Sequence, residues 1–454
     1  MITLSIADKL GQLPSEVEKY LLKYSIDKHR LEIHSDKVFE SAIVIPVLDE
    51  YDNLIKLLYS IVDNENRLFE KFVFVFVVNN TKLESKKALS DNKKSMQLLR
   101  RIVTGENPVT EIEQKAILSG LNIAVVDAST KGNELDEKHG GVGLARKLGM
   151  DLSLLLLNYN SSNKKFLVCL DADCTVAPNY LSEIYLNVNN RNINAGYVRF
   201  EHPTDINPYS EPIILYELFL RYYVLGLSYA KSSYAFHTIG STMITDYKAY
   251  ISIEGMNKRK AAEDFYFMQK LSKKYSISEI GTTVVFPSPR SSWRVPFGTG
   301  KSVGKYLENR EAPFLLHSPE VFTILKKWLM AFESDEIMTS VELISVAKSI
   351  SPILSSFLVQ NKFAQSWDKI AASSKSIDQL NRQKRFWFDG FKTLKLIHFL
   401  RDNLFPDIDG FEALNEMFEL NGIEIPNLDN NLSLAQKGLV YLEILRKNDF
   451  RGLL

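Results

Sequence analysis

The most constraining feature of the sequence is a series of short, continuous apolar runs that alternate with helix-sized segments. KFVFVFVV is rich in β-branched and aromatic residues without polar alternation, as expected of a strand that helices cover on both faces. LDEYDNLIKLLYSIVDN, between two such runs, carries apolar residues at helical spacing. The pattern predicts an α/β domain with a mostly parallel sheet flanked by helices. The predicted strands are 41–47, 71–78, 121–129, 164–171 and 194–200.

The domain organisation follows from changes in this pattern. The chain has 454 residues, 45% of them hydrophobic, which suffices for two or three packed domains. Helical periodicity without strand signals begins near residue 306, and LPSEVEKYLLKY near the N-terminus reads as a proline-initiated helix. We therefore predict an N-terminal helical extension, an α/β domain and an all-α C-terminal domain, with boundaries at 1–38, 39–305 and 306–454.

Composition excludes several function classes. Lysine plus arginine equals aspartate plus glutamate, 55 each, so no overall basic field exists to hold nucleic acid. The two cysteines, Cys169 and Cys174, are too few for a disulfide framework and favour a reducing, cytoplasmic compartment. No apolar segment reaches the roughly 18 residues of a membrane span, although peripheral membrane contact stays open.

Polar side chains gather where the predicted strands end. In open parallel sheets, ligands bind at the carboxyl ends of the strands. The residues at these ends are Asp49, Glu50, Asn79, Asn80, Asp171 and Asp173. The sequence therefore predicts a ligand site at this edge of the sheet.

Two Asp-x-Asp triplets occur in the chain, and their settings differ. Asp171 and Asp173 follow the apolar strand FLVCL, whereas Asp407 and Asp409 follow a proline in the helical region. Two carboxylates on a rigid strand end can share a hard divalent cation that also binds phosphate oxygens. The alternative for either triplet is an acidic turn or a helix cap, which is the simplest interpretation of the second.

Adjacent acids begin a helical segment in AAEDFYFMQKL. Glu263 and Asp264 can simply be favourable partners of the helix dipole. The functional alternative is that one carboxylate acts as a general base toward a hydroxyl group.

Two further segments carry candidate phosphate ligands. HGGVGLARKLG (139–149) joins a glycine-rich turn to a helix that contains Arg146, and helix-start amides can bind an anion. A dinucleotide-binding fingerprint requires G-x-G-x-x-G directly after a strand. Here the third glycine is absent and NELDEKH intervenes, which makes a Rossmann dehydrogenase unexpected. SPRSSWRVPFGTGKSVGKY (288–306) combines Arg290, Arg294, Lys301 and Lys305 with glycines, which predicts either a lid over a diphosphate or a solvated linker.

These motifs, taken in chain order, resemble those of inverting family 2 glycosyltransferases with the GT-A fold. The resemblance rests on VIPVLDE, VVNNT, GVGLARKLG, LDAD and GM…AED, and covers residues 40 to 300 or so. It implies a metal-dependent, hexosyltransferase-like enzyme that moves a sugar from a nucleotide-diphosphate sugar to an acceptor hydroxyl. The implied acceptor is a carbohydrate or a lipid-linked molecule, in the synthesis of a surface polysaccharide or glycoconjugate, and the implied cofactor is Mn²⁺ or Mg²⁺.

The resemblance also implies roles for individual residues. The implied nucleotide-sugar ligands are Pro46, Asp49, Glu50, Asn79, Gly143, Arg146, Asp171, Arg290 and Arg294. Asn79 stands where many family members carry an aspartate for the nucleobase, which leaves the base open. Asp173, with Asp171, would reach the metal ion, Asp264 would be the base, and Glu263 would support it or hold the acceptor.

One departure from the family concerns the metal. Relatives with a PxSRxxHxxR-like segment use its histidine as a ligand, whereas this chain has Trp293 near that place. His202, His237 and His317 are possible substitutes, although a lone histidine is more often structural.

Two other function classes remain open from the sequence. A nucleotidyltransferase would also use metal-binding aspartates on an α/β sheet, but would carry a glycine-rich basic loop after its first strand, where this chain has VLDEYDNL. A non-catalytic nucleotide-sugar-binding module would keep the fold without turnover.

Overall fold

The computed structural model describes residues 1–26, 28–65, 68–206, 208–291, 298–309 and 312–447, which form two compact units. Unit 1 comprises residues 1–203 and 238–298, and unit 2 comprises 204–237 and 299–454. The predicted domain boundaries at 38/39 and 305/306 stay predictions. No helix within the described part of the chain is long and apolar enough to cross a bilayer.

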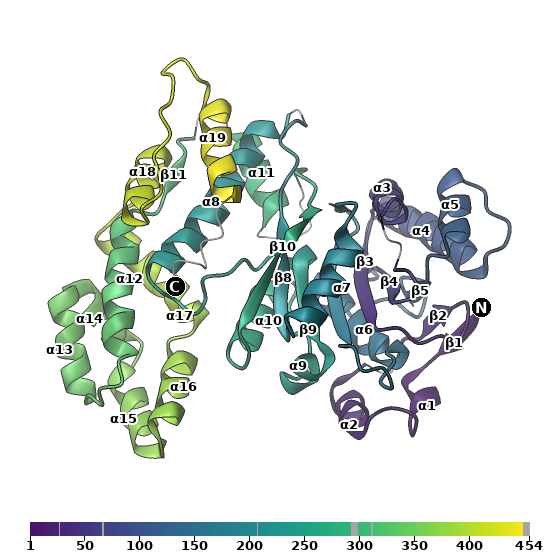
Figure 1. The fold of residues 1–454 in the computed structure, drawn as a ribbon, viewed down its shortest axis with the longest axis horizontal. Helices are drawn as coiled ribbons and strands as arrows, with labels where there is room; N and C mark the ends of the chain where they lie inside the picture. The colour runs from purple at the N-terminus through teal and green to yellow at the C-terminus, as the bar shows by residue number, and fades with distance from the viewer. Residues whose placement is uncertain (27, 66–67, 207, 292–297, 310–311, 448–454) are drawn as a thin grey trace. The chain divides into compact units, whose positions relative to one another are not determined.

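Unit 1 is built on a ten-stranded mixed sheet with the order β1-β2-β5-β4-β3-β6-β9-β8-β10-β7 (Figure 1). Strands β5, β4, β3 and β6 are parallel neighbours, as are β8 and β10. The strands are β1 Ile2–Leu4, β2 Leu31–Ile33, β3 Ser41–Val47, β4 Phe72–Asn79, β5 Ile123–Ala128, β6 Phe166–Cys169, β7 Thr175–Val176, β8 Ala195–Phe200, β9 Met243–Asp246 and β10 Ile277–Phe286. All five predicted strands are present, and the predicted α/β class with parallel central strands is confirmed.

Helices cover both faces of this sheet, which explains its uninterrupted apolar strands. Ile43, Ile45 and Val47 of β3 join the core formed with α3 and α4. Val44 points to the other face, where a Cβ on Gly149 of α6 would lie 2.4 Å from its Cγ1. The helices of unit 1 are α1 Ile6–Lys9, α2 Ser15–Tyr24, α3 Tyr51–Val62, α4 Lys86–Thr104, α5 Glu111–Ser119, α6 Val142–Ser153, α7 Tyr180–Asn190, α9 Tyr247–Ser252 and α10 Glu263–Ser272.

The N-terminal segment differs from the predicted helical extension. It contains the expected helix α2, but β1 and β2 add two strands to the edge of the main sheet through antiparallel pairing of β2 with β5. Three-residue strands with mixed burial carry too little periodicity for a sequence pattern to reveal them.

Unit 2 is helical, with its own core and, among its described residues, one short ladder between β11 Leu315–Leu316 and β12 Ile408–Asp409. Its long helix α8, Ser210–Tyr229, buries Tyr222 and Leu225. The other helices are α11 Thr299–Glu308, α12 Pro319–Phe332, α13 Ser340–Ile350, α14 Pro352–Gln360, α15 Phe363–Ser373, α16 Ile377–Trp387, α17 Gly390–Asn403, α18 Gly410–Leu420 and α19 Leu434–Lys447. Helix α11 carries Lys301 and Lys305, which were expected in a loop.

Candidate active site

Carboxylates collect at the carboxyl ends of β3 and β6, as the parallel register predicts. The β3–β6 ladder ends at Val44↔Cys169, so Pro46 lies beyond it and its missing N–H is not required there. Glu50 follows β3, and Asp171 and Asp173 follow β6. The chain thus brings three acidic side chains to one edge of the sheet.

Arg146 links the two predicted catalytic motifs. Its guanidinium group is buried, donates to Asp171 Oδ1 at 2.6 Å, and makes a second ion pair with Glu263. Burial alone would lower the pKa of Arg146, but Asp171 and Glu263 together raise it, so the arginine is charged. The segments LDAD and AED, far apart in sequence, therefore share one cation.

Two glycines make room for this arrangement. A Cβ on Gly240 would lie 2.4 Å from Arg146 Nη2, and a Cβ on Gly143 would lie 2.3 Å from the Arg259 carbonyl oxygen and 2.9 Å from Glu263 Cβ. Neither position has space for a side chain. Gly143 thus lets α6 approach the acidic segment closely. This packing role is separate from the nucleotide contact that was predicted for Gly143, which stays a prediction.

Arg290 makes a second link between acidic residues, Glu50 and Asp173. One guanidinium nitrogen pairs with Glu50 and lies 3.2 Å from Asp173 Oδ2. The neighbouring residue Arg294 and Trp293 lie outside the described residues.

The electrostatics of the site are dominated by negative charge. Five carboxylates, Glu50, Asp171, Asp173, Glu263 and Asp264, face two arginines, Arg146 and Arg290. Desolvation and repulsion from Glu50 and Asp171 raise the pKa of Asp173 to about 6. Desolvation, with repulsion from Asp264, raises the pKa of Glu263 to about 7, and desolvation also raises that of Asp264. A further cation would relieve this excess charge.

The described residues contain no ready-made metal cage. No three His, Cys, Asp or Glu side chains are grouped as ligands in the described ranges. Among the histidines considered as substitutes, His317 belongs to unit 2, where its Nδ1 lies 2.7 Å from Asp407 Oδ1. His202 is buried against Phe200, and His237 belongs to unit 2.

Asn79 has an internal structural role that the sequence did not reveal. Its side-chain amide donates to the carbonyl oxygens of Val47 and Val77, both at 3.1 Å. Asn92 of α4 donates to the Asn79 carbonyl oxygen and accepts from the Asp49 N–H at 3.0 Å. Asp49 itself has a φ of 54°, so Asn92 stabilises a strained turn at the end of β3. A contact of Asn79 with the nucleobase stays a prediction.

The second Asp-x-Asp triplet has a structural role, as predicted. Asp409 caps α18 by accepting from the N–H groups of Phe411 and Glu412, and Asp407 pairs with His317.

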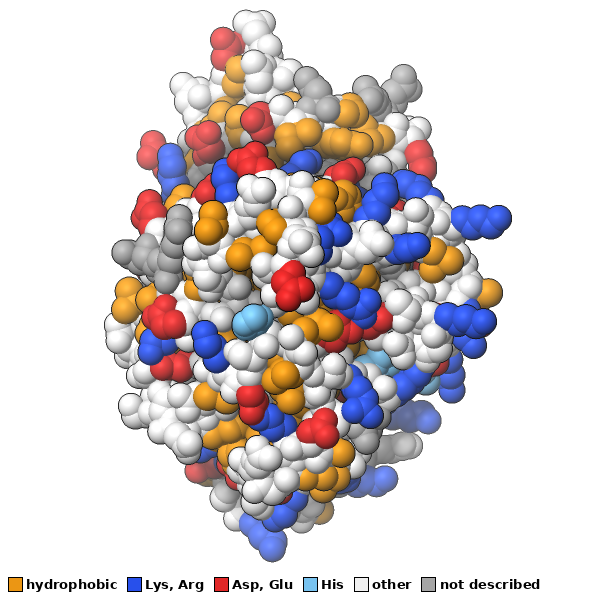
Figure 2. Space-filling model, turned by 90° about the vertical axis from the view of Figure 1, so that its right-hand side faces the viewer, with side chains coloured by type: hydrophobic (Ala, Val, Ile, Leu, Met, Phe, Trp, Pro, Cys, Tyr) orange, Lys and Arg blue, Asp and Glu red, His pale blue; other side chains and the backbone are white. Residues whose placement is uncertain are grey.

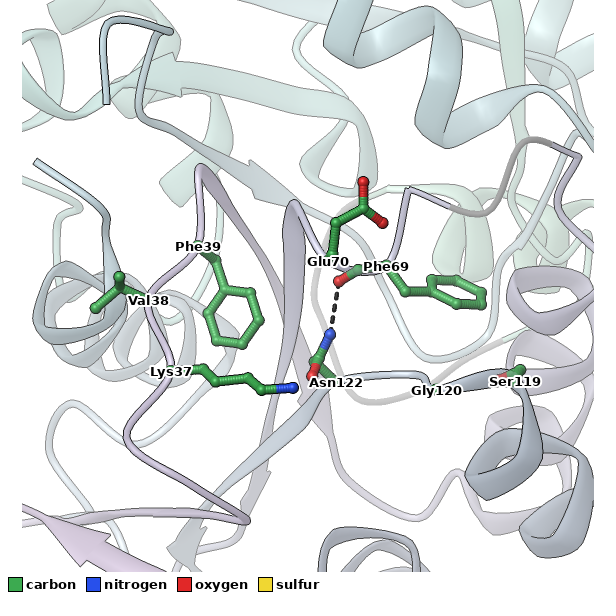
Figure 3. A pocket seen from close by; sticks show the side chains of 8 residues that line it. All are labelled: Lys37, Val38, Phe39, Phe69, Glu70, Ser119, Gly120 and Asn122. Atoms are coloured by element: carbon green, nitrogen blue, oxygen red, sulfur yellow. Dashed lines mark hydrogen bonds between the residues drawn. The ribbon is translucent and has the colours of Figure 1, made fainter. Parts of the chain in front are cut away.

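A shallow hollow of about 340 Å³ lies at the opposite edge of the sheet, near the amino ends of β3, β4 and β5 (Figure 3). Asn122 Nδ2 closes part of it by donating to the Phe69 carbonyl oxygen at 2.6 Å. Lys37 and Glu70 are its only ionisable lining residues, and both are exposed. Nothing in this hollow competes with the acidic site as a catalytic centre.

Comparisons with known proteins give structural similarity only. No protein-family model matches the chain, and no curated protein matches it. The chain is similar to the crystal structure of S. aureus TarS residues 1–349 in complex with UDP-GlcNAc, with 12% identity, 86% and 95% of the two chains covered, and a TM-score of 0.36. It is also similar to the mannosyltransferase PcManGT from Pyrobaculum calidifontis in complex with GDP-Man and Mn²⁺, with 13% identity, 86% and 92% covered, and a TM-score of 0.35.

Proposed function

We propose that the chain is a metal-dependent inverting glycosyltransferase of the GT-A fold, which moves a sugar from a nucleotide-diphosphate sugar to an acceptor hydroxyl. The observation that carries this proposal is the Arg146 bridge between Asp171 and Glu263. It joins a strand-end Asp-x-Asp triplet to an acidic helix start, which is the combination of donor ligand and base that such a reaction needs.

Binding of the donor is assigned to the strand ends. Arg146 and Arg290 each keep a buried Nε–H without an acceptor among the described residues, and phosphate oxygens are natural acceptors for guanidinium groups. Asp171 would reach toward the ribose. Glu50, now paired with Arg290, would line the nucleotide pocket with Pro46, Asp49 and Asn79.

The carboxylates fit a divalent cation. The net negative charge of the site and the raised pKa of Asp173 are what an added cation would compensate. Asp173, with Asp171, would hold Mn²⁺ or Mg²⁺ beside the diphosphate, and water would complete the ligand set. When bound, such an ion supplies charge stabilisation for the departing nucleotide diphosphate.

Proton removal is assigned to Asp264. Asp264 is the second residue of α10. Its carboxylate accepts from the Phe265 N–H at 2.7 Å, and the residue follows Glu263, which Arg146 holds in place. Asp264 would take the proton of the acceptor hydroxyl as that oxygen attacks the anomeric carbon from the face opposite the nucleotide. A single displacement of this kind inverts the anomeric configuration without a covalent intermediate.

Donor binding tests the proposal directly. The full chain is incubated with Mn²⁺ and a panel of uridine, guanosine, adenosine and thymidine diphosphates and their sugars, and thermal stabilisation and slow donor hydrolysis are measured. We expect at least one nucleotide to raise the melting temperature in the presence of Mn²⁺, with a much smaller shift for Asp173→Asn. Stabilisation by none of them would contradict the proposal.

A further inference from the structure

A run of three consecutive basic residues directly precedes the candidate base. Lys258, Arg259 and Lys260 form the longest such run in a chain whose formal net charge is zero. All three side chains are exposed, and none makes an ion pair with any described residue. Figure 2, which presents the face at the right of Figure 1, shows both basic and acidic side chains there.

These cations do not serve the acidic site itself. The charge that lowers the pKa values of Glu263 and Asp264 is Arg146, which is buried between the carboxylates. The three residues therefore remain available to a ligand that approaches the base from solvent.

The loop that presents them is held in place. Asn257 accepts from the Arg259 N–H at 3.1 Å and donates to the Glu263 carbonyl oxygen at 2.8 Å, so one side chain ties the start of the loop to its end. The loop also packs on the start of α6, where a Cβ on Gly141 would lie 3.3 Å from Lys260 Cα. Its position relative to Glu263 is thus fixed by contacts at both ends.

Arg259 is also oriented. Its guanidinium carbon lies 3.8 Å from the ring centroid of Tyr266 on α10, a stacking arrangement that limits the rotamers of the arginine. Ala262, between the cations and Glu263, has a φ of 56°, and this left-handed turn redirects the chain into α10. A pre-oriented arginine flanked by two lysines matches an anion with several oxygens.

We propose that the acceptor carries a phosphate group close to the hydroxyl that is glycosylated, and that Lys258, Arg259 and Lys260 bind this phosphate. The inference rests on the proposed glycosyltransferase function, because it places the phosphate beside the base of that reaction. An ionised phosphate offers more oxygens and more charge than a single carboxylate, and so suits three adjacent cations better.

Matched acceptor probes test the inference. Binding and sugar transfer are measured with Mn²⁺ and the stabilising donor, for glucose 6-phosphate against glucose, glycerol 3-phosphate against glycerol, and phosphatidylglycerol vesicles against phosphatidylcholine vesicles. We expect glucose 6-phosphate, glycerol 3-phosphate or the anionic phosphatidylglycerol vesicles to bind more tightly than the other member of the pair in at least one case. Phosphatidylcholine also carries a phosphate, but its choline group cancels the charge. The soluble and vesicle arms distinguish a free phosphoester from a lipid headgroup. Glucuronate is the carboxylate probe, and preference for it over glucose 6-phosphate would overturn the phosphate assignment.

The variant Lys258→Gln/Arg259→Gln/Lys260→Gln links the effect to the loop. We expect roughly a tenfold or larger loss of affinity for the phosphate probe, because several charge-assisted contacts disappear together, while donor-induced stabilisation is retained. The matched control is Lys362→Gln/Lys369→Gln/Lys375→Gln, at three exposed lysines of unit 2. It changes the net charge equally and should leave the affinity for the phosphate probe and the donor-induced stabilisation unchanged. Normal donor binding without phosphate preference would refute this inference alone, whereas failure to bind any donor would refute the proposed function.

Discussion

The same Asp-x-Asp triplet occurs in both units, with different surroundings. Asp171 and Asp173 follow the buried strand β6, face further carboxylates, and share two arginines with them. Asp407 and Asp409 satisfy local needs instead, as partner of His317 and as cap of α18. Desolvation and repulsion raise the pKa of Asp173, whereas the hydrogen bond and charge of His317 outweigh burial and lower that of Asp407. The comparison shows that the strand and its neighbours, rather than the triplet, indicate chemistry.

The largest effect is expected at the base beside the first triplet. Asp264→Asn removes the proton acceptor, and we expect donor hydrolysis and sugar transfer to fall roughly 10²- to 10⁴-fold, the usual contribution of general base catalysis. Nucleotide-induced stabilisation should persist, because Asp264 is assigned no donor contact. Asp409→Asn in the second triplet is the matched control, since asparagine also caps a helix. Full activity of the Asp264 variant would show that the base assignment is wrong.

Removal of the buried cation tests whether the first triplet is part of one charge cluster. Arg146→Met leaves Glu263 and Asp171 without their shared partner, and breaking a buried ion pair in this way destabilises a fold by about 3–5 kcal/mol. Chemical denaturation monitored by circular dichroism measures the loss.

Lowering the pH should reduce the loss of stability caused by Arg146→Met. Glu263 has a pKa of about 7 even with Arg146 present, so without Arg146 it protonates as pH falls below neutrality. Asp264 adds to this effect as pH falls through its own raised pKa. A destabilisation that is independent of pH would show that lost packing, and not the buried carboxylates left without a cation, causes the effect.

The pH dependence of the reaction tests whether the base of the first site is a carboxylate with a raised pKa. Desolvation raises the pKa of Asp264, the proposed base, so the ionised base is lost as pH falls through a pKa above the ordinary value for a carboxylate. We expect the rate of donor hydrolysis to rise with pH and to level off once the pH exceeds this raised pKa. If the rate instead rose at about pH 4, the ordinary pKa of a carboxylate, the base would titrate as an exposed group.

The sequence predicted the elements of the site better than its internal connections. Continuous apolar runs identified the central strands, and their ends located Glu50, Asp171 and Asp173, because burial on both faces leaves a clear signal. The roles of Gly240 and Asn92 could not be predicted, since a close approach to Arg146 and a hydrogen bond to Asp49 depend on long-range packing. Strands β1 and β2 were missed because three-residue strands carry too little periodicity.

A buried network on α6 gives a smaller prediction about the N-terminal segment. Tyr20 of α2 and Tyr250 of α9 each donate to Asp151 Oδ1 at 2.7 Å, and Lys147 Nζ lies 2.9 Å from Asp151 Oδ2. A Cβ on Gly255 would lie 1.9 Å from the Tyr20 hydroxyl oxygen, so this hydroxyl touches the turn that leads to the base. Tyr20→Phe should cost about 1–3 kcal/mol, the usual penalty for a buried polar group that loses its partner, measured by denaturation.

The smallest effects are expected at the second triplet. Asp409→Ala removes the two hydrogen bonds that cap α18, and loss of an N-cap costs about 0.5–2 kcal/mol. We expect the melting temperature of unit 2 to fall while nucleotide-induced stabilisation of the chain is retained. Asp173→Asn should show the opposite pattern, with little change in stability and weaker Mn²⁺ binding in the presence of nucleotide, measured by calorimetry. If Asp409→Ala weakened Mn²⁺ binding as much as Asp173→Asn, the two triplets would not differ in function, because a helix cap has no reason to affect a cation held at the strand ends.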